Sequence, residues 1–107
     1  MTVKINIADQ YTTHPLGRFK SAWPFSGQRF REEFLEKPLH AGENVIVDIN
    51  GTKGLAPSFL EEAFGGLIPT GLSPEKLKSL LTIVGDDQAR IEEIWFYIES
   101  ASATTAQ

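Results

Sequence analysis

Cysteine is absent from this chain, and histidine occurs only at His14 and His40. Without cysteine there is no disulfide and no thiolate nucleophile, so nothing in the sequence indicates an oxidising compartment. A third histidine that could complete a metal site is missing, and we expect both histidines to be solvated. The G-x-S-x-G motif of serine hydrolases and the H-E-x-x-H motif of zinc proteases are missing too. We therefore expect a protein that is not an enzyme and that holds no metal or cofactor.

Long hydrophobic runs and an excess of positive charge are also missing. No stretch approaches the roughly 20 apolar residues that a membrane span needs, and the first residues lack the pattern of a secretory signal. We therefore expect a cytoplasmic protein that does not bind membranes. The net charge of -4 and the pI of about 5.1 argue against a nucleic-acid partner, because binding to phosphates depends on clustered Lys and Arg.

Hydrophobic periodicity alternates between strand and helix within a length, 107 residues, that suits one core. The predicted strands are residues 3–8, 44–49 and 80–84, with a short fourth strand near residues 18–20 pairing with the first. The predicted helices are residues 27–37, capped by Ser26 and ended by Pro38, then 59–67, 74–77 and a last helix carrying Ile91, Ile94, Trp95 and Ile98.

This alternation predicts an α/β fold with an open, mostly parallel or mixed sheet of about four strands and three to four helices. The apolar run of residues 45–49 predicts a central strand covered on both faces. We expect one domain over residues 1–100 and a flexible tail over residues 101–107, which are small and polar.

The corner between the second strand and the next helix carries two candidate sites. Ser58 and Glu61 form the S-x-x-E pattern of a capping box, in which the serine hydroxyl accepts an unsatisfied backbone N–H. The same hydroxyl, at a helix start, would also suit phosphorylation, although Glu61 and Glu62 would repel the added charge. The turn before it, Gly51, Thr52, Lys53 and Gly54, suits either a tight turn with positive φ or an anion site, and it lacks the spacing of a phosphate-binding loop.

A predicted loop upstream combines cations with aromatic residues. Arg18, Phe19, Lys20, Trp23 and Phe25 have the composition that is enriched at binding hot spots, and equally that of a cover for the edge of a small core. If this loop packs beside the Ser58 helix, the two form one recognition surface. Its partner-binding candidates are Arg18, Lys20, Trp23, Phe59, Glu61 and Glu62.

Two segments of the chain together resemble a known family. Asn44–Gly51, followed by the Ser-Phe-x-Glu-Glu-x-Phe-Gly pattern of Ser58–Gly65, resembles the STAS-like domain family, bacterial relatives of anti-sigma factor antagonists. The likeness extends upstream to Gly17-Arg18 and Phe30–Glu32 and covers about Val3 to Ile98.

The resemblance implies a STAS-like sheet with helices that acts as a bacterial, cytoplasmic protein-binding module in partner-switching signal transduction. In the antagonists a histidine-kinase-like ATPase is the partner and phosphorylates a serine at the start of the corresponding helix. By position Ser58 is the candidate phosphoacceptor. The antagonists usually carry Asp-Ser-Ser-Gly or Asp-Ser-Thr-Gly at this turn, whereas this chain has Ala56-Pro57-Ser58-Phe59. The hydroxyl therefore lacks a preceding aspartate, and Phe59 replaces a small residue that leaves the serine open to a kinase.

The leading hypothesis is therefore a non-enzymatic regulatory domain that binds a protein partner through the Ser58 helix and the neighbouring loop. The alternative is a small-molecule or nucleotide-binding domain that uses the Gly51–Gly54 turn and the start of the Ser58 helix as an anion site.

Overall fold

Three parallel strands form the sheet in the computed structural model, which describes residues 2–105. They are β1 (Thr2–Asn6), β2 (Asn44–Asp48) and β3 (Leu81–Val84), in the spatial order β1-β2-β3. Val3 pairs with Val45, and Val45 pairs with Leu81. The predicted α/β fold with an open parallel sheet is confirmed, with three strands instead of about four.

The predicted short strand at residues 18–20 is wrong. Those residues lie in an irregular loop whose backbone pairs with the start of a helix: Gly27 N donates to Gly17 O at 2.9 Å and Gln28 N to Arg18 O at 3.0 Å. With its backbone used there, the segment does not pair with β1.

Helical segments make up most of the remaining chain. They are α1 (Ile7–Gln10), α2 (Gly27–Phe30), the π turn η1 (Arg31–Leu35), α3 (Glu36–His40), α4 (Pro57–Phe64), the 3-10 turn η2 (Gly65–Leu67), α5 (Pro74–Leu80) and α6 (Gln88–Thr105). Two predicted caps are confirmed, because Ser26 Oγ accepts from Arg29 N and Ser73 Oγ accepts from Lys76 N.

Pro38 does not end the helix that begins at Gly27, and helical structure runs on to His40. The π turn just before Pro38 explains the difference. In it Glu36 N donates to Arg31 O, five residues back, so the backbone hydrogen bonds shift by one residue before a proline that has no N–H to offer.

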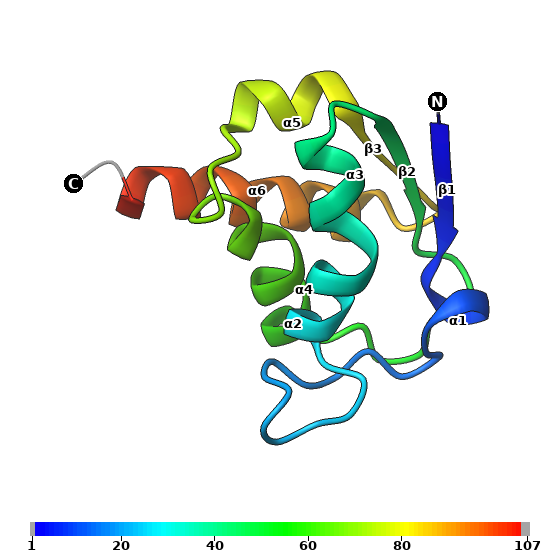
Figure 1. Ribbon diagram of the computed structural model, residues 1–107. Coiled ribbons are helices and arrows are strands. Elements are labelled where there is room, and N and C mark those ends of the chain that lie inside the picture. The colour runs from blue at the N-terminus through cyan, green and yellow to red at the C-terminus, as the bar shows by residue number, and fades with distance from the viewer. Residues whose placement is uncertain (1, 106–107) are drawn as a thin grey trace.

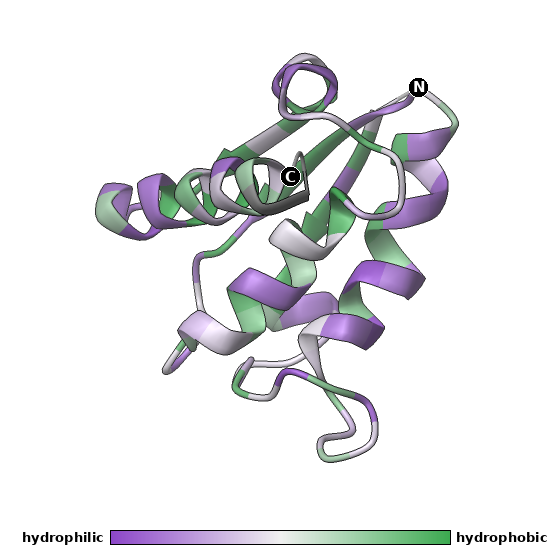
Figure 2. Cartoon of the chain, turned by 90° about the vertical axis from the view of Figure 1, so that its left-hand side faces the viewer, coloured by the Kyte–Doolittle hydropathy of each residue, from purple (hydrophilic) through white to green (hydrophobic). Residues whose placement is uncertain are grey.

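The helices cover one face of the sheet. Figure 1 shows the sheet at the right, with β1 outermost and the helices from α2 to α6 to its left, and Figure 2 shows them in front of the strands. In β2 the side chains of Val45 and Val47 are fully buried beneath them, whereas Ile46 on the other face is only half-buried, and Val84 of β3 is 37% exposed. β2 is the central strand, as predicted, but the prediction that it is covered on both faces is wrong.

The reason is the strand order. The three strands lie side by side in the order in which they follow each other along the chain. When all crossover connections between such strands are right-handed, their helices pack on the same face of the sheet. After β3, α6 turns back against α4 and η2 on that face, so it does not cover the other.

The predicted flexible tail is helical as far as Thr105, because α6 continues through this segment. Ala101 is partly buried against the core, which gives the last turns of the helix a packing contact. Ala106 and Gln107 lie outside the described residues.

Aromatic packing joins the helices to the loop before them. Phe30 and Phe59 are fully buried with ring centroids 5.8 Å apart, and the Tyr11 ring lies 5.2 Å from that of Phe30. Tyr11 also donates its hydroxyl to Ser26 O at 2.8 Å, and burial raises the pKa of Tyr11 to about 12. This cluster anchors the base of the loop to the core.

Truncating Phe30 to alanine should lower the free energy of unfolding by about 3–5 kcal/mol, because it leaves a cavity at the centre of this cluster. Phe96 is the matched control, since it is also a helical phenylalanine but 64% exposed. Its truncation should change the free energy by no more than about 0.5 kcal/mol. Denaturant unfolding of both variants checks this, and equal losses would contradict the placement of the core.

Candidate functional site

The loop of residues 12–26 packs against the start of α4, and together they form the site that we call the loop–α4 corner (residues 12–26 and 53–62). Lys53 N donates to Thr13 O at 2.6 Å, Ala56 N to Pro15 O at 3.0 Å, and Ser58 Oγ to Leu16 O at 3.3 Å. The two parts of the recognition surface considered from the sequence therefore meet, and the loop is fixed to the helix through its own backbone.

Ser58 is the second residue of α4, so the prediction that it caps the helix is wrong. The cap is Ala56, which has no side chain to accept a hydrogen bond, and Pro57 takes the first helical position. Proline suits that position because its φ is already helical and its missing N–H would have no partner there. The half-buried Ser58 hydroxyl is left to bond the loop.

Charge pairs hold the middle of the loop to the second turn of α4 and to η1. Arg18 lies 2.5 Å from Glu61 and 3.8 Å from Glu62. Lys20 reaches Glu32 at 2.7 Å, and this hydrogen bond lowers the pKa of Glu32. Four predicted partner-binding residues, Arg18, Lys20, Glu61 and Glu62, thus lie at the corner and pair within the chain.

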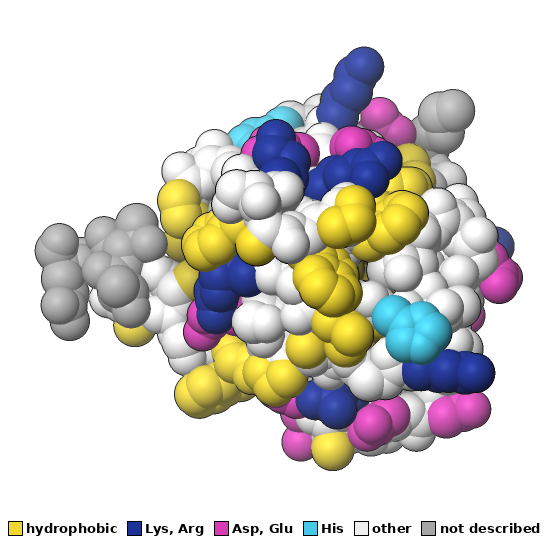
Figure 3. Space-filling model, turned by 90° about the horizontal axis from the view of Figure 1, so that it is seen from below, with side chains coloured by type: hydrophobic (Ala, Val, Ile, Leu, Met, Phe, Trp, Pro, Cys, Tyr) yellow, Lys and Arg dark blue, Asp and Glu magenta, His cyan; other side chains and the backbone are white. Residues whose placement is uncertain are grey.

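Four large hydrophobic side chains are exposed on the same loop: Leu16 by 38%, Phe19 by 49%, Trp23 by 42% and Phe25 by 41%. Figure 3 views this end of the molecule and shows hydrophobic side chains gathered among Lys and Arg. Trp23 packs across Gly17, where a Cβ would collide with the indole ring, so its position is held. The Arg29 guanidinium lies 5.4 Å from the centroid of the Phe25 ring.

Phe59 is not part of this surface. Its ring is fully buried and packs with the rings of Phe30 and Tyr11, so the prediction that it contacts a partner is wrong. One residue after Ser58, the helix turns this side chain from the loop toward the core.

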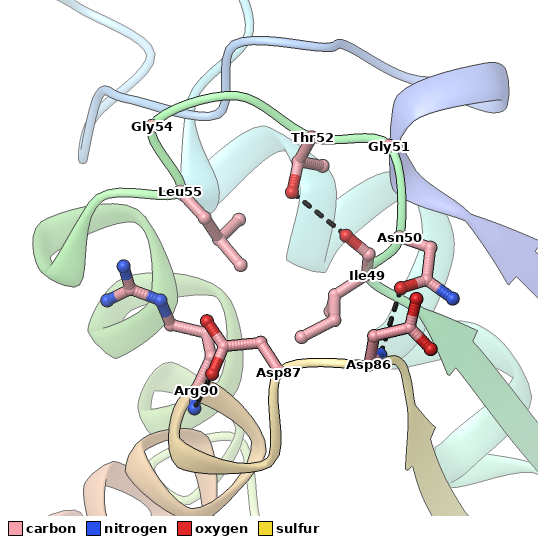
Figure 4. Close-up of a pocket in the computed structure, with 9 residues that line it drawn as sticks. All are labelled: Ile49, Asn50, Gly51, Thr52, Gly54, Leu55, Asp86, Asp87 and Arg90. Carbon is pink, nitrogen blue, oxygen red and sulfur yellow. Dashed lines mark hydrogen bonds between the residues drawn. The ribbon is translucent and has the colours of Figure 1, made fainter.

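A second candidate site lies at the carboxyl ends of β2 and β3. The Asn50–Gly54 turn and the segment that leads into α6 enclose a cavity of about 300 Å³ (Figure 4). Asn50 Oδ1 accepts from Asp86 N at 2.9 Å and Thr52 Oγ1 donates to Ile49 O at 2.9 Å. Gly51 and Gly54 have φ of 90° and 65°, so they serve the tight turn that the sequence allowed for.

The chemistry of this cavity does not suit an anion. Asp86 and Asp87 line it, and its cation, Arg90, pairs with Glu93 at 2.8 Å. The Ser58 helix does not line it, and Lys53 is not part of its wall. The turn and the start of the Ser58 helix therefore do not form the single anion site that the alternative hypothesis required.

A family model described as a STAS-like domain of unknown function (DUF4325) matches residues 26–89. The chain belongs to this family. No curated protein and no solved structure matches it. The matched range of the STAS-like domain runs from the Ser26 cap to the start of α6, so it contains Ser58 but leaves out most of the aromatic loop.

Arg31 is the site residue that sequence reasoning missed in this STAS-like domain. It is buried, and it pairs with Glu62 at 2.7 Å and Glu36 at 2.8 Å while donating to the Glu62 carbonyl at 2.7 Å. Burial alone would lower the pKa of Arg31, but these hydrogen bonds raise it above its ordinary value. The sequence did contain one indication of this role. Arg31 lies four residues before the buried Leu35, so a helix places its charge on the same apolar side as that leucine.

Glu62 therefore lies between two guanidinium groups, Arg31 in the core and Arg18 on the loop. A Cβ at Gly66 would collide with Arg31, so this glycine leaves the room that the buried guanidinium occupies. The network ties η1, α4 and the loop together and fixes the geometry of the corner.

Within residues 2–105 the STAS-like domain shows no group of three or more side chains able to hold a metal ion. Over the same residues, none of its helices combines the length and hydrophobicity required to span a bilayer. His14 and His40 are both exposed, as expected, and each contacts a threonine hydroxyl at 2.9 Å.

Adjacent glutamates provide a test of the network. Glu62→Gln removes a charge that faces the buried Arg31 and should lower the free energy of unfolding by about 1–3 kcal/mol. Glu61→Gln removes a half-exposed partner of Arg18 and should cost about 1 kcal/mol or less. Parallel urea titrations measure both, and an equal loss for the two variants would contradict a buried role for Glu62.

Proposed function

We propose that this STAS-like domain is a non-enzymatic regulatory module that binds a protein partner through the loop–α4 corner. The observation that carries the proposal is the group of exposed aromatic residues on a loop that backbone hydrogen bonds and ion pairs fix to α4. Trp23 is held across Gly17, and Arg18 is paired with Glu61. Aromatic anchors that are already ordered lose little entropy on binding, and Trp and Arg dominate binding hot spots.

The partner that the resemblance to the antagonists favours is a histidine-kinase-like ATPase. The proposal places regulation at Ser58. A phosphate there would remove the hydroxyl proton donated to Leu16 O and would add negative charge one turn before Glu61. Arg18, which now pairs with Glu61, would then face a second anion. Phosphorylation would thus change how the loop sits on α4.

Truncation of Trp23 to alanine tests the binding surface. The expected result is a loss of partner affinity of about tenfold or more, because a central aromatic anchor is removed. Phe96→Ala is the control, since this exposed aromatic lies on α6, outside the corner, and should change affinity by less than about twofold. The measurement is a titration against the isolated ATPase of the source organism. Unchanged affinity in the Trp23 variant would remove the corner as the binding surface.

Replacement of Ser58 with Ala and with Glu tests the switch separately. We expect Ser58→Ala to bind like the wild type and Ser58→Glu to change affinity by about tenfold, because the new charge competes with Glu61 for Arg18. Phosphosite mapping of protein from the native host accompanies the titrations. Equal binding by all three forms would remove the switch and leave the binding surface intact.

The cavity beside the Asn50–Gly54 turn supports a second candidate function, binding of a small molecule. Its two carboxylates and the Asn50 and Thr52 side chains suit a polar neutral or cationic ligand better than a nucleotide. A ligand at 100 times its dissociation constant should stabilise the domain by about 2.7 kcal/mol. A thermal-shift panel of amines, sugars, nucleotides and phosphorylated metabolites checks this. Absence of a shift with every compound would count against the candidate.

A further inference from the structure

β1 is an edge strand, and the hydrogen bonds of the sheet show which of its backbone groups face outward. Ile49 N donates to Val84 O at 3.0 Å, so the odd-numbered residues of β2 direct their backbone toward β3 and the even-numbered ones toward β1. In the parallel register of β1 with β2, the backbone groups of the odd-numbered β1 residues therefore point toward β2. The N–H and C=O groups of Thr2, Lys4 and Asn6 therefore point to the free edge.

The side chain of Gln10 closes one end of this edge. Its Oε1 atom accepts the N–H of Asn6, which agrees with the outward direction derived from the register. The outward N–H and C=O groups of Thr2 and Lys4 remain available to pair with a further strand. In Figure 1, β1 is the outermost strand of the sheet, and α1 lies at its lower end.

A groove of about 350 Å³ runs beside the same strand and is lined mainly by β1 and by the helical segment around η1. Its apolar wall includes Val3, Phe34 and Pro38, all half-buried. A strand added to β1 would direct alternate side chains into this groove and the others onto the open face of the sheet. The edge and the groove thus have the two parts that strand addition uses: backbone groups for pairing and a pocket for every second side chain.

The charges along this edge select the occupant. Lys4, on the open face, and Lys37, at the groove, have no carboxylate within 4.0 Å among residues 2–105, whereas Glu33 at the groove is already paired with Arg29 at 2.7 Å. Glu43, at the groove, and Asp48, on the open face, likewise have no lysine or arginine within 4.0 Å among residues 2–105. Asp48 lies on β2, one strand in from the edge, so Lys4 is the charged side chain that an added strand meets first on the open face. In the register centred on Lys4, which pairs the most backbone groups of Thr2, Lys4 and Asn6, β1 of a second copy would bring two Lys4 side chains together, and like charges across a strand pair are unfavourable.

We propose that the β1 edge binds an extended segment of a partner protein in which acidic residues facing Lys4 alternate with apolar residues facing the groove. This surface is separate from the loop–α4 corner, so the inference goes beyond the proposed function and stands or fails independently of it.

The test uses the full chain and an acetylated Val-Glu-Val-Glu-Val pentapeptide amide as the probe. NMR titration should shift the amide resonances of Thr2, Lys4 and Phe34, and hydrogen exchange of the Lys4 amide should slow. A Val-Lys-Val-Lys-Val peptide should bind at least about fivefold more weakly, because its lysines face Lys4 on the open face of the sheet. Absence of shifts along β1 at millimolar peptide, or equal binding of the two peptides, would overturn the proposal.

Two variants of one residue separate backbone from charge. Lys4→Pro removes an N–H that faces outward, so the β1–β2 ladder is kept, and it should abolish binding of both peptides. Lys4→Ala keeps the N–H and should only reduce the preference for the acidic peptide. A thermal-unfolding scan confirms that both variants fold. Unchanged binding by folded Lys4→Pro, or self-association of the wild type through β1, would contradict the assignment.

Discussion

The strand order β1-β2-β3 is the constraint on which the rest of the structure depends. Because all connections run over one face, the core forms between that face and the helices, with Val45 and Val47 at its centre. The other face is left open, and so is the β1 edge apart from its end at Asn6, which Gln10 closes. The domain thereby forms a complete core and still exposes three separate surfaces: the backbone of the β1 edge, the open face of the sheet and the loop of residues 12–26.

The close approach between α2 and α4 fixes the position of the loop–α4 corner relative to the core. A Cβ at Gly27 would collide with Phe59 O, so the glycine lets the two helices meet backbone to backbone. Arg31 then crosses between them to Glu62, and Arg18 reaches the same helix from the loop. The loop is therefore ordered by hydrogen bonds and charge pairs, while its aromatic side chains remain exposed. This division suits a surface whose hydrophobic groups are available to a partner.

Local sequence patterns predicted most of the elements because their signals are local. Alternation of Val3 and Ile5 with polar residues gave β1, and Ser73 followed by Pro74 gave the start of α5. Ser58 failed as a cap because Pro57 beside it suits the first helical position and moves the helix start to Ala56. Pro38 failed as a helix end because a π turn precedes it.

Features that depend on contacts between distant parts of the chain could not be predicted from local sequence patterns. The apolar run of β2 shows that the strand is buried, but coverage of its second face depends on where α6 turns. Likewise the meeting of the loop with α4 rests on contacts between residues about 40 positions apart, such as Ser58 with Leu16. The resemblance to the antagonists made Ser58 a candidate phosphoacceptor by its position. It could not show that the loop lies across the hydroxyl.

Hydrogen–deuterium exchange of the domain alone and in complex with its partner tests the central claim most directly. Binding at the loop–α4 corner should protect the amides of residues 18–25 and of the first turn of α4, and should leave the Asn50–Gly54 turn unchanged. Protection confined to that turn, with exchange in the loop unaltered, would contradict a partner-binding role for the corner.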